Sequence, residues 1–320
     1  LDVIEHQTEK LTEVEGIGDK RIEMIKKAWE EQREIREVML FLQGHGVSAT
    51  YASKIFKAYG KEAIQVVQEN PYRLATDIFG IGFITADKIA QKLGFSIESE
   101  FRIQAGILYV LHQLSDEGHV FYQRQALITK CTEILEVEAS LVDKCLADLN
   151  AERKVIIENL TAPGADEIQE AVYLAKYHFS ETSIARKLQK LLSSPKSIRK
   201  VNTEKALDWV QKTYSMSLAE KQAEAVRKAF EDKILVITGG PGTGKSFLLS
   251  AILKIVSQLK VKIMLAAPTG RAAKRMNEAT GFEAKTIHRL LEFDFQKGGF
   301  KKDEEHPLNC DLLIVDEMSM

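Results

Sequence analysis

The sequence has little cysteine and no long apolar run. Its 320 residues include 3 cysteines. Cys131, Cys145 and Cys310 have neither metal-ligand spacing nor an even number for disulfides, which fits small buried residues in a reducing compartment. No apolar run approaches the ~18 residues of a membrane-spanning helix, and the N-terminal residues lack an apolar signal region. We therefore expect a cytoplasmic protein with no membrane partner.

An excess of charge of one sign is also lacking. The formal net charge is −2, so the molecule as a whole does not attract nucleic acid electrostatically. Any contact with DNA must therefore come from local groups. The length allows two or three domains with cores of their own.

A glycine-rich loop near the C-terminal end predicts a phosphate site. It consists of Gly239, Gly240, Pro241, Gly242, Thr243, Gly244, Lys245 and Ser246, and Phe247 follows it. The apolar run 234–238 before it predicts a strand buried on both faces, and the apolar spacing after it predicts a helix. Such a loop directs backbone N–H groups and the positive helix end at phosphate oxygens. Lys245 would reach the β- and γ-phosphates, and Ser246 would bind Mg²⁺.

A second motif predicts hydrolysis of the bound nucleotide. The apolar residues 312–315 read as another buried strand, which ends in Asp316 and Glu317. Parallel strands place ligands at their carboxyl ends, so Asp316 can hold Mg²⁺ and Glu317 can orient or deprotonate the attacking water. Alone, these acids would be ordinary surface residues. Together with the glycine loop, they predict catalysis by Lys245, Asp316 and Glu317.

Glycine pairs repeat in the first hundred residues. Gly16 and Gly18 flank one apolar residue, as do Gly80 and Gly82, and a weaker copy at 46–48 has serine in place of its second glycine. Each copy predicts a helix, a tight hairpin and a second helix. The pattern resembles the helix-hairpin-helix motif, in which hairpin amides and basic residues bind backbone phosphate without reading sequence. A purely structural hairpin is the alternative, and it suits the copy with serine best.

The middle of the chain predicts a mixed helix and strand module. Apolar spacing indicates helices at 101–115, 125–137 and 140–151, followed by strands at 154–160 and 170–174. Three helices followed by a two-stranded hairpin are the order of a winged-helix module. Such a module either contacts DNA or only packs, and the sequence leaves both open.

Further residues around the glycine loop suggest adenine and DNA contacts. Gln222 precedes the loop and carries a donor and an acceptor that could read the adenine edge, although a surface glutamine is the alternative. A third strand at 263–267 leads into a hydroxyl, a glycine amide and a guanidinium, a suitable grip for single-stranded nucleic acid. The residues of this grip are Pro268, Thr269, Gly270 and Arg271, with Thr286 and His288 as further strand-contacting candidates.

Taken together, the chain resembles the RecD-like superfamily 1 DNA helicases, in particular the longer bacterial subtype with an N-terminal extension. The resemblance rests on the hairpin repeats, the winged-helix-like segment, Gln222, the loop at 239–246, the segments 268–273 and 286–291, and Asp316 with Glu317. Met318 departs from the alanine that the family has after the two acids. This position should not affect Mg²⁺ or water.

The resemblance implies a multidomain architecture. We expect an all-α helix-hairpin-helix domain at 1–100 and a winged-helix-like α+β domain with a linker at 101–200. We expect the first part of an α/β P-loop, RecA-like parallel-sheet motor domain at 201–320. The remaining motor motifs would then lie beyond Met320.

The resemblance also implies an activity. It indicates an ATP-dependent DNA helicase that uses ATP and Mg²⁺ to translocate on single-stranded DNA, 5′ to 3′, and to unwind forked duplexes in repair or recombination. Repair or single-strand-binding proteins are candidate partners. The rival hypothesis is a nucleotide-switched DNA-binding repair adaptor that separates no strands.

A β-hairpin is predicted after the third strand. Phe293, Phe295 and Phe300 alternate around a lysine and two glycines, a pattern typical of a hairpin. In RecD-like enzymes a hairpin inserted here, at about 291–306, acts as a pin at the duplex fork. The resemblance implies that these aromatic rings meet the last base pair and that Lys301 and Lys302 meet phosphate.

Overall fold

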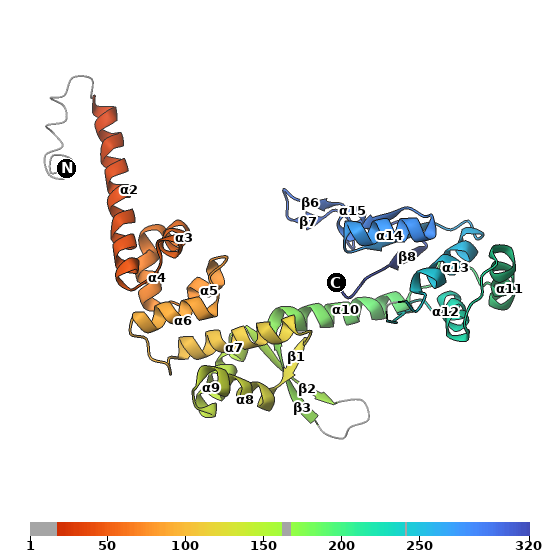
Figure 1. Cartoon of the computed structure of the whole chain (residues 1–320), viewed down its shortest axis with the longest axis horizontal. Helices are drawn as coiled ribbons and strands as arrows, with labels where there is room; N and C mark the ends of the chain where they lie inside the picture. The colour runs from red at the N-terminus through yellow and green to blue at the C-terminus, as the bar shows by residue number, and fades with distance from the viewer. Residues whose placement is uncertain (1–17, 162–167, 241) are drawn as a thin grey trace. The chain divides into compact units, whose positions relative to one another are not determined.

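The computed structural model in Figure 1 describes residues 18–161, 168–240 and 242–320. The predicted site residues Gly16 and Pro241 lie outside the described residues. The chain divides into two units, 1–183 and 184–320, and each is described by itself. None of the helices in the described ranges is long and apolar enough to cross a membrane.

Unit 1 is a succession of helices followed by a small sheet. Its helices are α2 (Asp19–Gly44), α3 (Ala49–Tyr59), α4 (Ala63–Glu69), α5 (Arg73–Asp77), α6 (Phe83–Lys92), α7 (Glu100–Asp116), α8 (Arg124–Leu135) and α9 (Ala139–Ala151). Its strands are β1 (Phe121–Gln123), β2 (Val155–Thr161) and β3 (Ile168–Leu174), and α10 (Ala175–Ser193) follows them. The three helices predicted between 101 and 151 are confirmed as α7, α8 and α9.

The sheet of unit 1 is antiparallel, in the order β1-β3-β2. The predicted hairpin is confirmed, with Val155 opposite Leu174 and Thr161 opposite Ile168. The sequence analysis missed β1, which pairs Phe121 with Tyr173. Only three residues long, β1 is too short to show the alternation that reveals a strand.

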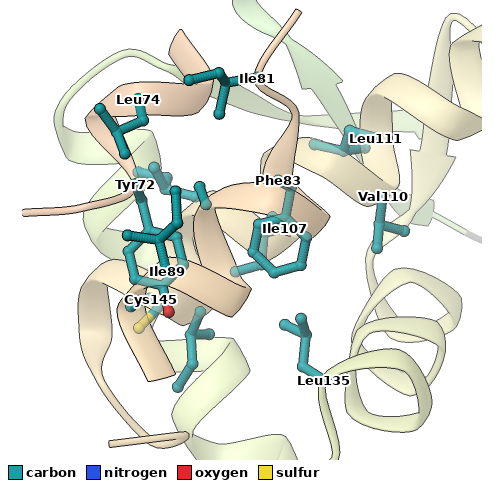
Figure 2. Packing of buried hydrophobic residues seen from close by; sticks show 14 of the residues in the cluster. Tyr72, Leu74, Ile81, Phe83, Ile89, Ile107, Val110, Leu111, Leu135 and Cys145 are labelled. Atoms are coloured by element: carbon teal, nitrogen blue, oxygen red, sulfur yellow. The ribbon is translucent and has the colours of Figure 1, made fainter. Parts of the chain in front are cut away.

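One hydrophobic core joins the hairpin helices to the mixed segment. It extends along the chain from Val38 to Leu174. Figure 2 shows Phe83 of α6 beside Ile107 of α7, with Leu111 and Leu135 nearby. The second and third glycine hairpins therefore pack into the same core as the helices that carry the sheet.

A buried ion pair reinforces this core. Arg102 of α7, only 8% exposed, donates through Nε to Asp87 Oδ1 of α6 at 2.9 Å. The same guanidinium donates to the carbonyl oxygens of Ile97 at 3.0 Å and Leu135 at 2.8 Å. The hydroxyl of Tyr72 donates to Asp87 at 2.8 Å. One arginine thus ties α6, α7 and the end of α8 together.

Unit 2 combines helices with a parallel sheet. Its helices are α11 (Thr203–Tyr214), α12 (Glu220–Glu231), α13 (Lys245–Ser257), α14 (Gly270–Thr280) and α15 (Ile287–Leu290). Its strands are β4 (Ile263–Ala267), β5 (Ala284–Thr286), β6 (Phe293–Asp294), β7 (Gly299–Phe300) and β8 (Leu312–Val315). The parallel sheet has the order β5-β4-β8, with Leu265 opposite both Ala284 and Ile314. The predicted parallel-sheet character is confirmed.

Two predictions about buried strands were wrong. The run 234–238 before the glycine loop is not a strand, and Val236 is 79% exposed. A strand requires a neighbouring backbone, and among the described residues no strand pairs with this run. Strand β8 exists, but Leu313 is 43% exposed because, within the same residues, β8 has a partner only on its β4 side.

We expect the change Asp87→Ala to destabilise unit 1 by about 3–5 kcal/mol, because it leaves the buried guanidinium of Arg102 unpaired. The readout is urea-dependent labelling of Cys131 and Cys145, which are buried in this core. Burial raises the pKa of the Cys131 thiol to about 12, so this thiol should react only after unfolding.

The matched control is Glu37→Ala, which removes an exposed carboxylate that pairs with Arg33 at 3.9 Å on the surface of α2. This change should cost about 0–1 kcal/mol. Equal labelling midpoints for the two variants would contradict a central role of the buried pair.

Candidate nucleotide and nucleic-acid sites

The glycine loop leads directly into α13. Gly242 and Gly244 have φ values of +78° and +80°, a conformation that favours glycine. The Lys245 ammonium donates to the carbonyl oxygens of Gly239 at 2.5 Å and Gly240 at 2.9 Å. The hydroxyl of Thr243 donates to the carbonyl of Gly240 at 2.9 Å. Phosphate oxygens would therefore have to compete with loop carbonyls for Lys245.

Gln222 of α12 reaches this loop. Its Nε2 donates to the carbonyl oxygen of Thr243 at 3.2 Å. Its Oε1 accepts from the backbone N–H of Ala219 at 3.0 Å. Each end of the amide thus retains one further hydrogen-bonding position, because a primary amide offers two donors and two lone pairs.

A cavity of about 400 Å³ joins the two predicted sets of site residues. Ser246, Asp316 and Glu317 from the nucleotide set line it, together with Thr269 and Arg271 from the nucleic-acid set. A hydroxyl and carboxylates in one cavity provide the oxygen ligands that Mg²⁺ prefers, with water completing its shell. The donor set therefore fits Mg²⁺. Arg275 also lines this cavity, and the sequence analysis did not name it as a site residue.

The two acids continue from β8 in a specific backbone arrangement. The N–H of Asp316 donates to the carbonyl of Ala266 at 3.0 Å and so extends the pairing with β4. Asp316 Oδ1 accepts from the N–H of Glu317 at 3.0 Å. Glu317 has φ +55°, an unusual value for a residue other than glycine. Strained backbone of this kind clusters at functional sites.

The predicted nucleic-acid grip is divided between two helix starts. Thr269, which follows Pro268, begins α14 and accepts from the N–H of Ala272 at 3.2 Å through its hydroxyl. Thr286 begins α15 and accepts from the N–H of Arg289 at 3.3 Å. Because β4 and β5 are parallel neighbours, both threonines lie at the same edge of the sheet. Gly270 and Arg271 are exposed there.

The predicted β-hairpin after α15 is confirmed. Phe293 of β6 lies opposite Phe300 of β7, with their ring centroids 5.0 Å apart. The His288 ring lies 5.4 Å from that of Phe293 and 5.7 Å from that of Phe300. Phe295 is instead 88% exposed. The three phenylalanines therefore differ, because two form the hairpin base with His288, while Phe295 contacts the Phe293 ring at 5.1 Å and otherwise projects.

The two lysines after the hairpin also differ. Lys302 lies 3.7 Å from the carboxylate of Glu292. Lys301 is exposed, and no acidic partner for it occurs in the part of the chain that the structure describes. Lys301 is thus the better placed of the two to meet a phosphate.

In unit 1, the second and third hairpin copies contact each other. Lys92 Nζ of α6 donates to the carbonyl of Gly46 at 3.1 Å, and Lys54 Nζ of α3 donates to the carbonyl of Phe79 at 3.4 Å. Gly80 has φ +87°, which favours glycine in this turn. The repeats therefore form a tandem in which each copy supplies a lysine to the other.

The remaining hairpin glycines begin helices. Gly82 starts α6 and Gly18 starts α2, neither with a side-chain cap. The sequence analysis missed Lys54 and Phe79. Aligning the repeats would have revealed Lys54, because it occupies in α3 the position that Lys88 occupies in α6.

Comparison with known proteins agrees with this geometry. A family model described as the ATP-dependent RecD2 DNA helicase HHH domain matches residues 31–121, and an AAA domain matches residues 222–320. The ATP-dependent RecD2 DNA helicase of Deinococcus radiodurans is 31% identical over 325 residues, which cover 100% of this chain and 44% of that relative. The chain belongs to the RecD-like helicase family.

Other RecD-like relatives match a smaller share of this chain. The RecBCD enzyme subunit RecD of Haemophilus influenzae is 35% identical over 123 residues, which cover 31% of this chain and 19% of that subunit. The corresponding subunit of Mycolicibacterium smegmatis is 34% identical over 125 residues, 32% of this chain and 23% of the subunit. The chain therefore spans less than half the length of each of these relatives. The hairpin tandem lies within the segment that matches the RecD2 family model.

The hypothesis that Gln222 reads the adenine edge predicts that Gln222→Ala lowers the affinity for ATP about tenfold and reduces the preference for ATP over GTP. Titration with fluorescent ATP and GTP analogues in the presence of Mg²⁺ measures both effects. The control is Gln258→Ala at the end of α13, whose amide donates only weakly to Ser257 Oγ at 3.5 Å. Equal losses for ATP and GTP would mean that Gln222 only supports the Thr243 carbonyl.

Proposed function

We propose that this chain is the nucleotide- and DNA-binding part of an ATP-dependent DNA helicase of RecD-like type. The observation that carries the proposal is the cavity of about 400 Å³ in unit 2. Ser246, Asp316 and Glu317 reach it from the nucleotide side, and Thr269 and Arg271 reach it from the strand-binding side. Because both sets of residues line one cavity, a change at the nucleotide on hydrolysis can act directly on the residues that would bind DNA.

The chemistry follows from the positions of these groups. The loop amides and Lys245 hold the triphosphate after Lys245 leaves the carbonyls of Gly239 and Gly240. Ser246 and Asp316 would hold Mg²⁺, which would neutralise charge on the transferred phosphoryl group. Glu317 accepts a proton from the attacking water or orients it. Gln222 binds the adenine edge.

The strand-binding groups lie where the products of hydrolysis can affect them. Thr269 and Arg271 bind sugar-phosphate at the start of α14, and Thr286 and His288 extend the contact along the same sheet edge. Loss of the γ-phosphate removes charge from the cavity that Arg271 and Arg275 also line. A change in the position of α14 would then move the strand. The direction 5′ to 3′ is proposed from family resemblance alone.

The hairpin β6–β7 is the proposed pin that meets the duplex fork. Its projecting ring, Phe295, is the one suited to contact the last base pair. Phe293, Phe300 and His288 hold the base of the hairpin by ring contacts of 5.0–5.7 Å. Lys301 supplies charge to an adjacent phosphate.

Unit 1 is proposed to hold DNA outside the motor. The tandem hairpins bind backbone phosphates through Gly80, Gly82 and the neighbouring lysines. The order of α7, β1, α8, α9, β2 and β3, with β3 between β1 and β2, supports a winged-helix module. A DNA-binding adaptor that uses nucleotide only as a switch is disfavoured, because Glu317 lies in the cavity where a catalytic base is required.

We expect Lys245→Ala in the full-length protein to lower DNA-stimulated ATP hydrolysis by about 10²–10³-fold, because the transferred phosphate loses the contact with the lysine ammonium. Glu317→Gln should permit ATP binding but stop turnover. A phosphate-release assay with single-stranded DNA measures the rate. Glu278→Gln is the control, because this carboxylate lies on α14 and pairs with exposed Lys274. Continued turnover in Lys245→Ala would refute the assignment.

For the pin, we expect Phe295→Ala in the full-length protein to slow unwinding of a forked duplex about tenfold and to leave DNA-stimulated ATP hydrolysis intact. Loss of one stacking ring costs about 1–3 kcal/mol at a base contact. A fluorescent fork assay measures strand separation. Phe179→Ala, which removes a phenylalanine of α10 that is 72% exposed, is the comparison for ring loss. Unchanged unwinding by Phe295→Ala would exclude this ring from the fork.

A further inference from the structure

Phe79 is the most exposed aromatic side chain noted in unit 1. Its relative exposure is 99%, although its apolar neighbours in the turn are buried. Ile78, Ile81 and Phe83 all belong to the core of the unit. An apolar ring in full contact with water, next to three buried neighbours, contributes nothing to this core. It is therefore available to a ligand.

The backbone beneath this ring is fixed. Gly80 has φ +87°, and the N–H of Ile81 donates to the carbonyl of Ile78 at 3.1 Å, which closes the turn. The carbonyl of Phe79 itself accepts from Lys54 Nζ at 3.4 Å. A rigid turn and a side chain with two rotatable bonds give a contact that loses little entropy on binding. The ring is thus held ready for a flat partner.

The charges around the hairpin favour a polyanion. Asp77 and Asp87 are both paired with arginines of the same unit. Among the described residues, Lys54, Lys88 and Lys92 have no carboxylate partner, and the hydrogen bonds of Lys54 and Lys92 go to neutral carbonyl oxygens. The two carboxylates are therefore neutralised within the unit, while the ammonium groups of the three lysines remain available to an anionic ligand. Lys54 contacts the backbone of the turn that carries the exposed ring.

The surroundings of Phe79 suit a base better than a protein. A protein interface would require a contiguous apolar patch of several hundred Å². Next to Phe79, the only other exposed large apolar side chain in the turn and the start of α6 is Ile84, at 50%. A single ring beside unpaired lysines is instead the combination that binds single strands, where bases stack on aromatic faces and cations follow the backbone.

We propose that Phe79 is a base-stacking residue. Its ring stacks on an unpaired base of single-stranded DNA, and Lys54 contacts the adjacent phosphate. This inference rests on the proposed function of the hairpin tandem as a DNA-binding element. It adds contact with a base to a motif expected to contact only the backbone, so unit 1 would favour single-stranded over duplex DNA.

The test compares binding of the whole chain to two labelled oligonucleotides by fluorescence anisotropy. One is an ordinary single strand, and the other has the same length with abasic sugars in place of its nucleotides. Phe79→Ala should weaken binding to the ordinary strand about tenfold and leave binding to the abasic strand and to a blunt duplex unchanged. The slope of log K against log salt should also stay unchanged, because no phosphate contact is lost.

Two further variants distinguish a failure of the stacking proposal from a failure of DNA binding by the hairpins. Phe179→Ala removes a phenylalanine of α10 that is 72% exposed, and it should have no effect. Lys54→Ala should weaken binding to both strands and lower the salt slope by about 1. Thermal unfolding checks that each variant folds, and loss of the exposed Phe79 ring should not change the midpoint.

The outcomes are distinct. If Phe79→Ala binds the ordinary strand like the unaltered chain while Lys54→Ala weakens binding, the hairpins bind phosphate only, and stacking is refuted. Equal weakening on both strands by Phe79→Ala also refutes stacking. If neither variant changes binding, the tandem does not bind DNA, and the proposed role of unit 1 fails instead.

Discussion

Parallel pairing of β4 with β8 is the constraint on which the nucleotide site depends. Ala266 lies opposite Val315, so the segment after β4 and the acids after β8 emerge at the same edge of the sheet. The bond from the Asp316 N–H to the Ala266 carbonyl extends this alignment by one residue. A slip by one residue would turn the side chains at this edge to the opposite face. Ser246, Thr269 and Glu317 share a cavity because this register is kept.

Unit 1 depends on a different kind of interaction. A buried charge is costly unless its partner and its remaining donors are satisfied, and Arg102 satisfies them with one carboxylate and two carbonyls from three segments. This arrangement fixes α6, and α6 carries both Gly82 and Lys92. Because Lys92 in turn holds the Gly46 carbonyl, the buried pair helps to orient both hairpins of the tandem.

The sequence was most informative where a pattern is local. Helices α7, α8 and α9 show an apolar period over several turns, and the hairpin β6–β7 has its own turn residues, so these elements were predicted correctly. The run 234–238 has strand-like composition, yet a strand also needs a paired neighbour, and composition does not specify one. Arg102 was missed for a similar reason. Its acceptor in Leu135 lies 33 positions away, so only the tertiary structure reveals the contact.

The sequence also does not reveal which aromatic side chains are exposed. This exposure bears on function. In the motif around Phe293, three phenylalanines appeared equivalent, but two pack at the hairpin base and Phe295 projects. In the third glycine hairpin, Phe83 is buried and Phe79 projects. Each unit thus has a short turn, fixed by backbone hydrogen bonds, that carries one exposed ring near a lysine. Exposed apolar rings weaken solubility and add nothing to a core, so two of them on rigid turns are best explained by partners with flat faces. Nucleobases are such partners, so the base contacts proposed for the two units share one physical basis.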